Sequence, residues 1–230
     1  METTFLLSTA FIQSSSTATS FVIMTICSGI LLWVVPKCHR YHIFKMETYF
    51  HELCHGLASL ATGGSFHKFH VHSGGGECLT SGGNRYVVIT AGYIGVILSG
   101  TILLAKSTDC FLAVGLLQAL AIIFALSTLK AGDLHTVAIG VVVSAILGFC
   151  SILYPNAFLT RFLMNFLGII LIWQGIQSLK ILLFVSASDK NTNSDAKSLS
   201  NLIKKHPFTC ALIICCIAFV PLLILFAYIF

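Results

Sequence analysis

The chain has 230 residues, of which 57% belong to the apolar set AVILMFWYC and only 9% are charged. Soluble domains carry about 25% charged residues, so this composition excludes a water-soluble globule, and it equally excludes a disordered chain or a nucleic-acid-binding protein built on basic patches. Most of the basic groups behind the net charge of +5 lie between apolar runs, which indicates that they set the orientation of the chain in a lipid bilayer. We therefore expect an integral multi-pass membrane protein of one domain, residues 1–230, with about 20 apolar residues per crossing.

Residues 1–36 are predicted to form a first crossing. No charged residue occurs from Thr3 to Pro36. A secretory signal would carry basic residues before its apolar core, whereas the only early charge is Glu2. We expect a retained crossing, with cleavage after the Ser/Thr/Ala-rich stretch as the alternative. The basic and aromatic connector 37–45 follows and favours the cytoplasmic side.

Residues 47–62, ETYFHELCHGLASLAT, predict a short helix that is polar on one face. At 1.5 Å per residue it reaches only about 24 Å, so it must be covered by protein or line a water-filled space. The glycine-rich segment 63–85 predicts a β-hairpin or a re-entrant loop. In this segment His70 and His72 share one face of a strand, and a solvated hairpin is favoured over a metal-collecting loop.

Residues 86–184 are predicted to form a helical core of four apolar runs. A polar loop, 185–206, and a last crossing, 208–230, complete the chain. We expect an all-α polytopic membrane protein with six to seven transmembrane helices. The first connector and the polar loop are both basic and both favour the cytoplasm. Seven full crossings in alternation would place these two loops on opposite sides of the membrane, so one segment must fail to cross. The short helix with the glycine-rich segment after it is the candidate.

His51-Glu52-Leu53-Cys54-His55 forms an HExxH motif. On a helix, positions i and i+4 share one face, so both imidazoles can reach one Zn²⁺ ion. Glu52 then lies where its carboxylate can take a proton from a metal-activated water. The competing interpretation is a pair of helix-terminal histidines beside an exposed glutamate. It is disfavoured because ionisable groups at membrane depth are expensive and mark functional sites.

Four blocks in this order, HELCHGLASLATGG, GGGECLTSGG, ITAGYIGVILSG and NSDAKSL, resemble the B-like branch of the site-2-protease-type membrane zinc metallopeptidase family. In that family a HExxH helix ending in Gly-Gly precedes a glycine-rich strand pair, an AGYLG helix and an SDA loop. The resemblance implies a membrane-embedded zinc endopeptidase with ligands His51 and His55 and catalytic base Glu52. It also implies a substrate channel beside the glycine-rich strands, where an extended peptide can add as a strand. The residues concerned are Gly75, Gly76, Gly82 and Gly83.

The third zinc ligand departs from the family pattern, because the chain has no LDG-like motif. Asp195 matches the SDA block and is the first candidate, with a turn or helix N-cap as the competing interpretation. Asp133 is the alternative, and an N-cap is the favoured interpretation for it. Relatives often carry an acidic pair before the SDA block, where this chain reads LKILLFV, which weakens the expectation of full activity.

These features predict a zinc metalloendopeptidase that cleaves a membrane-tethered protein by metal-activated water, with Glu52 as general base. The alternative is a catalytically impaired member of the same family that acts as a membrane binding or regulatory protein. A divalent-metal transporter is disfavoured, because it would need ionisable residues spread over several crossings and the runs 86–105 and 110–129 carry none.

Overall fold

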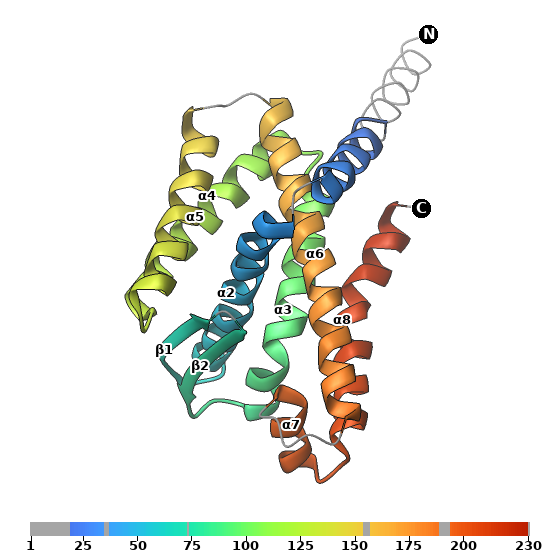
Figure 1. The fold of residues 1–230 in the computed structure, drawn as a ribbon. Helices are drawn as coiled ribbons and strands as arrows, with labels where there is room; N and C mark the ends of the chain where they lie inside the picture. The colour runs from blue at the N-terminus through green and yellow to red at the C-terminus, as the bar shows by residue number, and fades with distance from the viewer. Residues whose placement is uncertain (1–18, 35–36, 73, 154–156, 189–193, 230) are drawn as a thin grey trace.

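The computed structural model describes residues 19–34, 37–72, 74–153, 157–188 and 194–229. It shows a helical bundle with one two-stranded antiparallel sheet (Figure 1). The helices are Thr19–Val34, α2 (Lys37–Ala61), α3 (Arg85–Lys106), α4 (Cys110–Ser127), α5 (Leu134–Leu153), α6 (Ala157–Ala187), α7 (Asp195–Ile203) and α8 (Pro207–Ile229), with a 3₁₀ turn at Thr128–Lys130. The strands are β1 (Ser65–His72) and β2 (Gly75–Ser81). The predicted fold class is confirmed.

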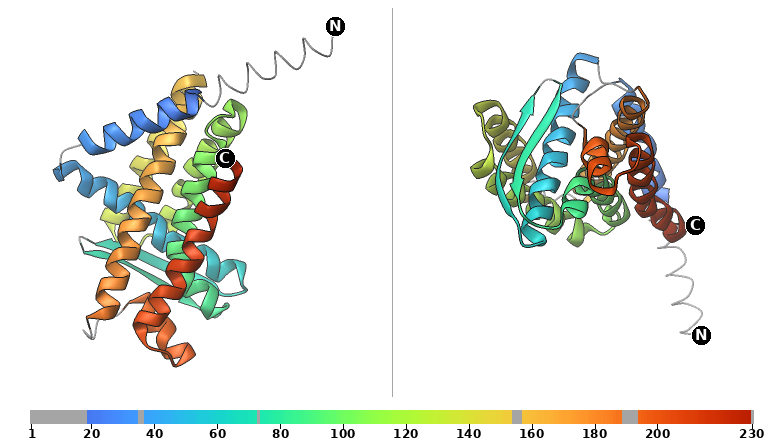
Figure 2. Two further views of the ribbon diagram at one scale, coloured as in Figure 1. Left: turned by 90° about the vertical axis from the view of Figure 1, so that its right-hand side faces the viewer. Right: turned by 90° about the horizontal axis from the view of Figure 1, so that it is seen from below.

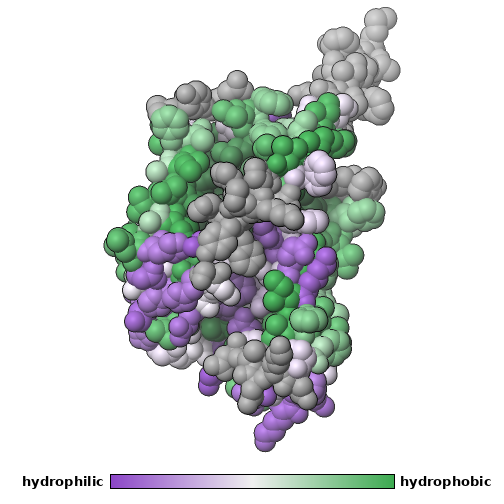
Figure 3. All heavy atoms as spheres, in the orientation of Figure 1, coloured by the Kyte–Doolittle hydropathy of each residue, from purple (hydrophilic) through white to green (hydrophobic). Residues whose placement is uncertain are grey.

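Five of the described helices are long and apolar enough to cross a membrane: α3, α4, α5, α6 and α8. This number is close to the predicted six to seven. The predicted first crossing lies partly outside the described residues, and its described part is the shorter apolar helix Thr19–Val34. Hydrophobic side chains cover the upper part of the face in Figure 3, whereas hydrophilic ones gather over the hairpin and at the lower end beside α7.

Helix α2 occupies the centre of the bundle, in contact with α3, α5, α6 and both strands (Figure 1). It begins at Lys37, ten residues before the predicted start, so the predicted connector 37–45 is helical. The reason is local, because no glycine or proline interrupts the chain between Pro36 and Gly56. The helix ends as predicted at a Gly-Gly turn, in which Gly63 has a φ of +82°.

The glycine-rich segment is a β-hairpin and not a re-entrant loop. Strands β1 and β2 pair in a register that sets His70 opposite Glu77. Three apolar residues of β1 are buried: Phe66, Phe69 and Val71. The outer edge of β1 is joined to the segment before α5, because the Gly132 amide donates to the Phe69 carbonyl at 2.8 Å. The hairpin therefore lies between α2 and the start of α5, as the view from below in Figure 2 shows.

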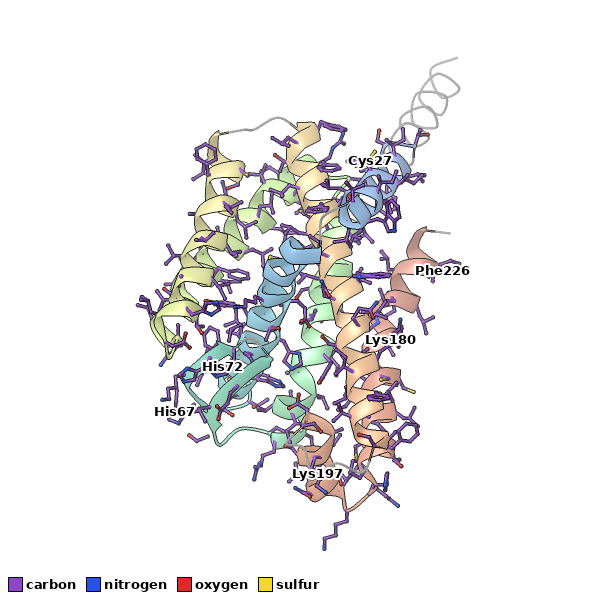
Figure 4. All side chains as sticks on the ribbon, viewed as in Figure 1. Cys27, His67, His72, Lys180, Lys197 and Phe226 are labelled. Carbon is purple, nitrogen blue, oxygen red and sulfur yellow. The ribbon has the colours of Figure 1, made fainter. Side chains whose placement is uncertain are left out.

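The predicted polar loop 185–206 contains the short helix α7. Ser194 is its N-cap, with a side-chain oxygen that accepts from the Lys197 amide at 3.3 Å. Helix α7 packs against α8 and also contacts α3 and α6. It thus lies at the end of the bundle that also holds the hairpin, whereas Cys27 and Phe226 lie toward the other end (Figure 4).

Candidate metal centre

The two histidines of the HExxH motif face the same side of α2. Their Nε2 atoms are 3.1 Å apart, and both residues are buried. The Nδ1 atom of His55 lies 2.6 Å from the Val88 carbonyl on α3. A carbonyl only accepts, so this contact places the proton of a neutral imidazole on Nδ1 and leaves the Nε2 lone pair free. The arrangement is typical of a histidine prepared as a metal ligand.

Asp195 reaches the same point from α7. Its Oδ2 atom lies 3.5 Å from His51 Nε2 and 3.6 Å from His55 Nε2. Burial acts to raise the pKa of Asp195, but the interactions with His55 and His51 outweigh it, so the pKa lies well below the usual range. The N-cap interpretation of Asp195 is wrong, because Ser194 fills that position. The carboxylate is therefore free to face the histidines.

The donor set fits a zinc ion. The three atoms lie within 4.8 Å of one another, with separations of 3.1, 3.5 and 3.6 Å. Ligand atoms of a tetrahedral zinc with bonds of 2.0–2.1 Å are about 3.3 Å apart. Two imidazoles and one carboxylate leave the fourth position open, which is the composition of catalytic zinc sites. Among the described residues, no second group of three such side chains converges in this way.

Gly92 of α3 makes room for the two imidazoles. A Cβ atom at this position would lie 2.6 Å from His55 Nε2 and would also overlap His51 Nε2. The ring of His51 is flanked in addition by Tyr93, with ring centroids 4.5 Å apart and nearly perpendicular planes. Two successive residues of α3 thus shape the space beside the ligands.

Asp133, the alternative third ligand, lies elsewhere. Its Oδ1 accepts from the Thr136 amide at 2.9 Å, and its Oδ2 lies 2.9 Å from His70 Nδ1. Desolvation acts to raise the pKa of Asp133, but the hydrogen bonds from Thr136 and His70 lower it to about 2. Asp133 therefore caps α5, as predicted from the sequence, and it also anchors the hairpin through His70.

Glu52 and β2 border a cavity of about 860 Å³ next to the three donor atoms. The cavity is lined by residues of α2, of both strands of the hairpin, and of α3, α6 and α7. Glu52 is buried, and a Cβ atom on Gly76 would lie 2.6 Å from its Oε1. The strand therefore passes directly over the carboxylate, at a distance that an added Cβ atom would turn into a clash unless the Glu52 side chain moved.

Of the four glycines expected beside the substrate channel, two line this cavity and two do not. Gly75 and Gly76 are part of the lining. Gly82 and Gly83 lie at the far end of β2, both with a φ near +70°, and a Cβ on Gly83 would lie 3.1 Å from the Ser59 carbonyl. These two form the turn that returns the chain past the end of α2 and lie outside the cavity lining, so their place beside the substrate channel stays a prediction.

Several residues of the cavity were missed at the level of sequence. Glu47 precedes His51 by four residues, so helix periodicity places both on one face of α2. Ser178 on α6 contacts Glu47, and this pairing across 131 residues leaves no local pattern in the sequence. The roles of Val88 and Gly92 likewise depend on the packing of α3 against α2.

A family model described as Peptidase M50B-like matches residues 7–226 of the chain. The match includes the helix with the HExxH motif and the short helix that begins at Asp195. No curated protein and no solved structure matches the chain.

Proposed function

The chain belongs to the Peptidase M50B-like family, and from this premise we propose that it is a membrane-embedded zinc metalloendopeptidase. Its metal ligands are His51, His55 and Asp195, and its catalytic base is Glu52. The observation that carries the proposal is the convergence of three donor atoms within 4.8 Å beside a buried glutamate and an open cavity. The substrate is the polypeptide of a membrane-tethered protein, which reaches the cavity beside β2.

Zinc bound by these three residues would polarise the scissile carbonyl and lower the pKa of the attacking water. Glu52 removes a proton from that water as its oxygen forms the bond to the carbonyl carbon. The C–N bond then breaks, and Glu52 delivers the same proton to the leaving nitrogen. The hydrogen bond from His55 to the Val88 carbonyl holds the imidazole in the ligating tautomer throughout.

The surroundings support catalysis inside the bundle. Glu52, His51 and His55 are each less than 10% exposed, and the cavity that they line gives water and substrate access to them. Five apolar helices of sufficient length support an integral multi-pass protein. Hydrophilic residues gather over the hairpin and beside α7, which both contribute to the cavity lining (Figure 3). The edge of β2 that does not pair with β1 offers main-chain groups to an unwound substrate.

The test compares zinc-loaded wild type with Glu52→Gln in detergent micelles, on a library of peptides produced from a bacterial proteome by a glutamate-specific protease. Mass spectrometry counts the new peptide ends. Glu52→Gln is expected to retain zinc and to lose at least about 100-fold in cleavage rate, the usual contribution of a general base. His55→Ala is expected to lose the metal, whereas His67→Ala, on the hairpin outside the cavity (Figure 4), is expected to keep it.

Equal cleavage by wild type and Glu52→Gln would eliminate hydrolysis at this site. A zinc-loaded wild type that binds peptides and cleaves none would support the regulatory alternative instead.

A further inference from the structure

Glu47 is a second buried carboxylate in the cavity, and the proposed reaction does not use it. Its side chain is 2% exposed and belongs to the cavity lining. Ser178 Oγ on α6 donates to its Oε1 atom at 3.1 Å. In the described part of the chain Glu47 forms no ion pair with a lysine or an arginine.

The second oxygen of this carboxylate opens on the cavity. Oε2 has no hydrogen-bond donor among the described residues. Among the described residues, the fully buried side-chain atoms that lack a hydrogen-bond partner are Arg161 Nε and Ser186 Oγ. Oε2 of Glu47 is not one of them, because it is accessible from the cavity. An ionised carboxylate accepts up to about four hydrogen bonds, so most of the capacity of Glu47 remains unused. The ionised form of a buried carboxyl group with one neutral donor is costly, so burial raises the pKa of Glu47, and a cationic partner would stabilise the charged form.

The charge around the cavity favours a cation as that further group. Four carboxylates line it: Glu47, Glu52, Glu77 and Asp195. Among the described residues no lysine or arginine lines it, and Lys180, which follows Ser178 by two residues on α6, is exposed and lies outside the lining (Figure 4). A zinc ion would offset Asp195 and Glu52, and water screens the exposed Glu77, which leaves Glu47 as the buried carboxyl group without a cationic partner.

We propose that Glu47 is a specificity-determining residue that pairs with a lysine or arginine side chain of the substrate. This proposal rests on the proposed peptidase function. Glu47 lies one helical turn from His51, which is about 6 Å along α2. An extended peptide rises about 3.3 Å per residue, so the basic residue is expected within about three positions of the cleaved bond.

The same peptide library tests the proposal, since its peptides retain internal lysine and arginine. Zinc-loaded wild type is expected to enrich basic residues at one position within three of the cleavage site. In a matched pair of synthetic peptides with lysine or glutamine at that position, kcat/KM should favour lysine by about tenfold. Glu47→Gln should reduce this preference to within about twofold while the zinc content stays unchanged.

Two variants complete the test. Glu77→Gln removes the same charge from an exposed position on the hairpin and is expected to change the lysine preference by less than about twofold, because water screens exposed charges. Glu47→Asp keeps the charge on a side chain shorter by one methylene and is expected to shift the preference from lysine toward the longer arginine. This variant decides the question if Glu47→Gln fails to fold.

The outcomes separate the two proposals. Cleavage by wild type without a basic preference, or an equal preference in wild type and Glu47→Gln, refutes the specificity role alone. Absence of cleavage by zinc-loaded wild type refutes the peptidase function and the specificity role together.

Discussion

Replacing Gly92 by alanine is expected to prevent tight zinc binding while the bundle stays folded. Gly92 lies on α3 directly against the two imidazoles of α2, and the added Cβ would meet His55 Nε2 at 2.6 Å and His51 Cε1 at 2.5 Å. Helix α3 cannot withdraw freely, because it also packs against α6 and α8. The imidazoles must therefore move, and they carry two of the three ligand atoms.

The size of the displacement sets the expected effect. Restoring an ordinary contact of about 3.4 Å requires a shift of about 0.8 Å, whereas metal–ligand distances tolerate only about 0.2 Å. Changes next to a ligand cost about 10–100-fold in metal affinity, and this one displaces two ligands at once. We expect a zinc dissociation constant at least about 100-fold higher. Alanine also favours the helix by about 1 kcal/mol relative to glycine, which opposes any loss of helix stability.

Competition between the protein and a zinc-responsive dye in detergent micelles measures this constant. Gly115→Ala is the matched control, because a Cβ at this helical position of α4 has no atom within 4 Å. The control should bind zinc like wild type. A Gly92→Ala protein whose dissociation constant stays within about twofold of wild type would show that the imidazoles do not hold the ion where the structure points them.

Three further variants probe the neighbouring groups. Asp195→Asn removes the charged ligand and should weaken zinc binding by at least about tenfold in the same competition assay. Asp133→Ala should leave zinc affinity unchanged but remove an N-cap worth about 1 kcal/mol, measured as a lower thermal unfolding midpoint. Because the pKa of Asp133 is lowered to about 2, this difference in midpoint should be present above pH 4 and should close as the pH falls toward 2; a gap that stays constant over this range would contradict it. Gly76→Ala should press on Glu52 and slow peptide cleavage by about 100-fold with zinc retained, whereas Gly74→Ala, with open space around its Cβ, should not; equal rates for the two variants would refute the close approach of β2.

The histidine pair of the HExxH motif was accessible to sequence reasoning because its geometry is local. Two residues separated by four positions share a face wherever a helix forms, and no feature of the rest of the fold is needed. Asp195 is different, since it lies 140 positions after His55 in the sequence. Its match to a known sequence block made it a candidate, but only the packing of α7 against α3 and α8 sets the 3.6 Å separation from His55.

The choice between Asp195 and Asp133 depended on which of them caps a helix. Both aspartates stand at a helix start, and residue type alone does not separate the two interpretations. The residue before each aspartate does separate the two interpretations. Ser194 supplies a hydroxyl that caps α7 and releases Asp195, whereas Gly132 has no side chain and leaves the cap of α5 to Asp133. One residue of context thus separates a helix cap from a candidate metal ligand.

The predicted start of the HExxH helix concealed the role of Glu47. A helix that begins at Glu47 places this carboxylate at a helix N-terminus, where a negative charge is ordinary and stabilising. Because α2 begins at Lys37, the carboxylate instead lies within the helix and inside the bundle, in the same cavity as the three donor atoms. There the helix macrodipole hardly stabilises the carboxylate, and Ser178 supplies only one neutral hydrogen bond to it. The stretch LKILLFV on α6 lacks the acidic pair that relatives often carry, but it does not leave the cavity short of carboxylates, since α2 contributes Glu47 from a different direction. A buried acid in this position lowers the stability of the fold. The proposed pairing with a basic side chain of the substrate explains why an acid stands there.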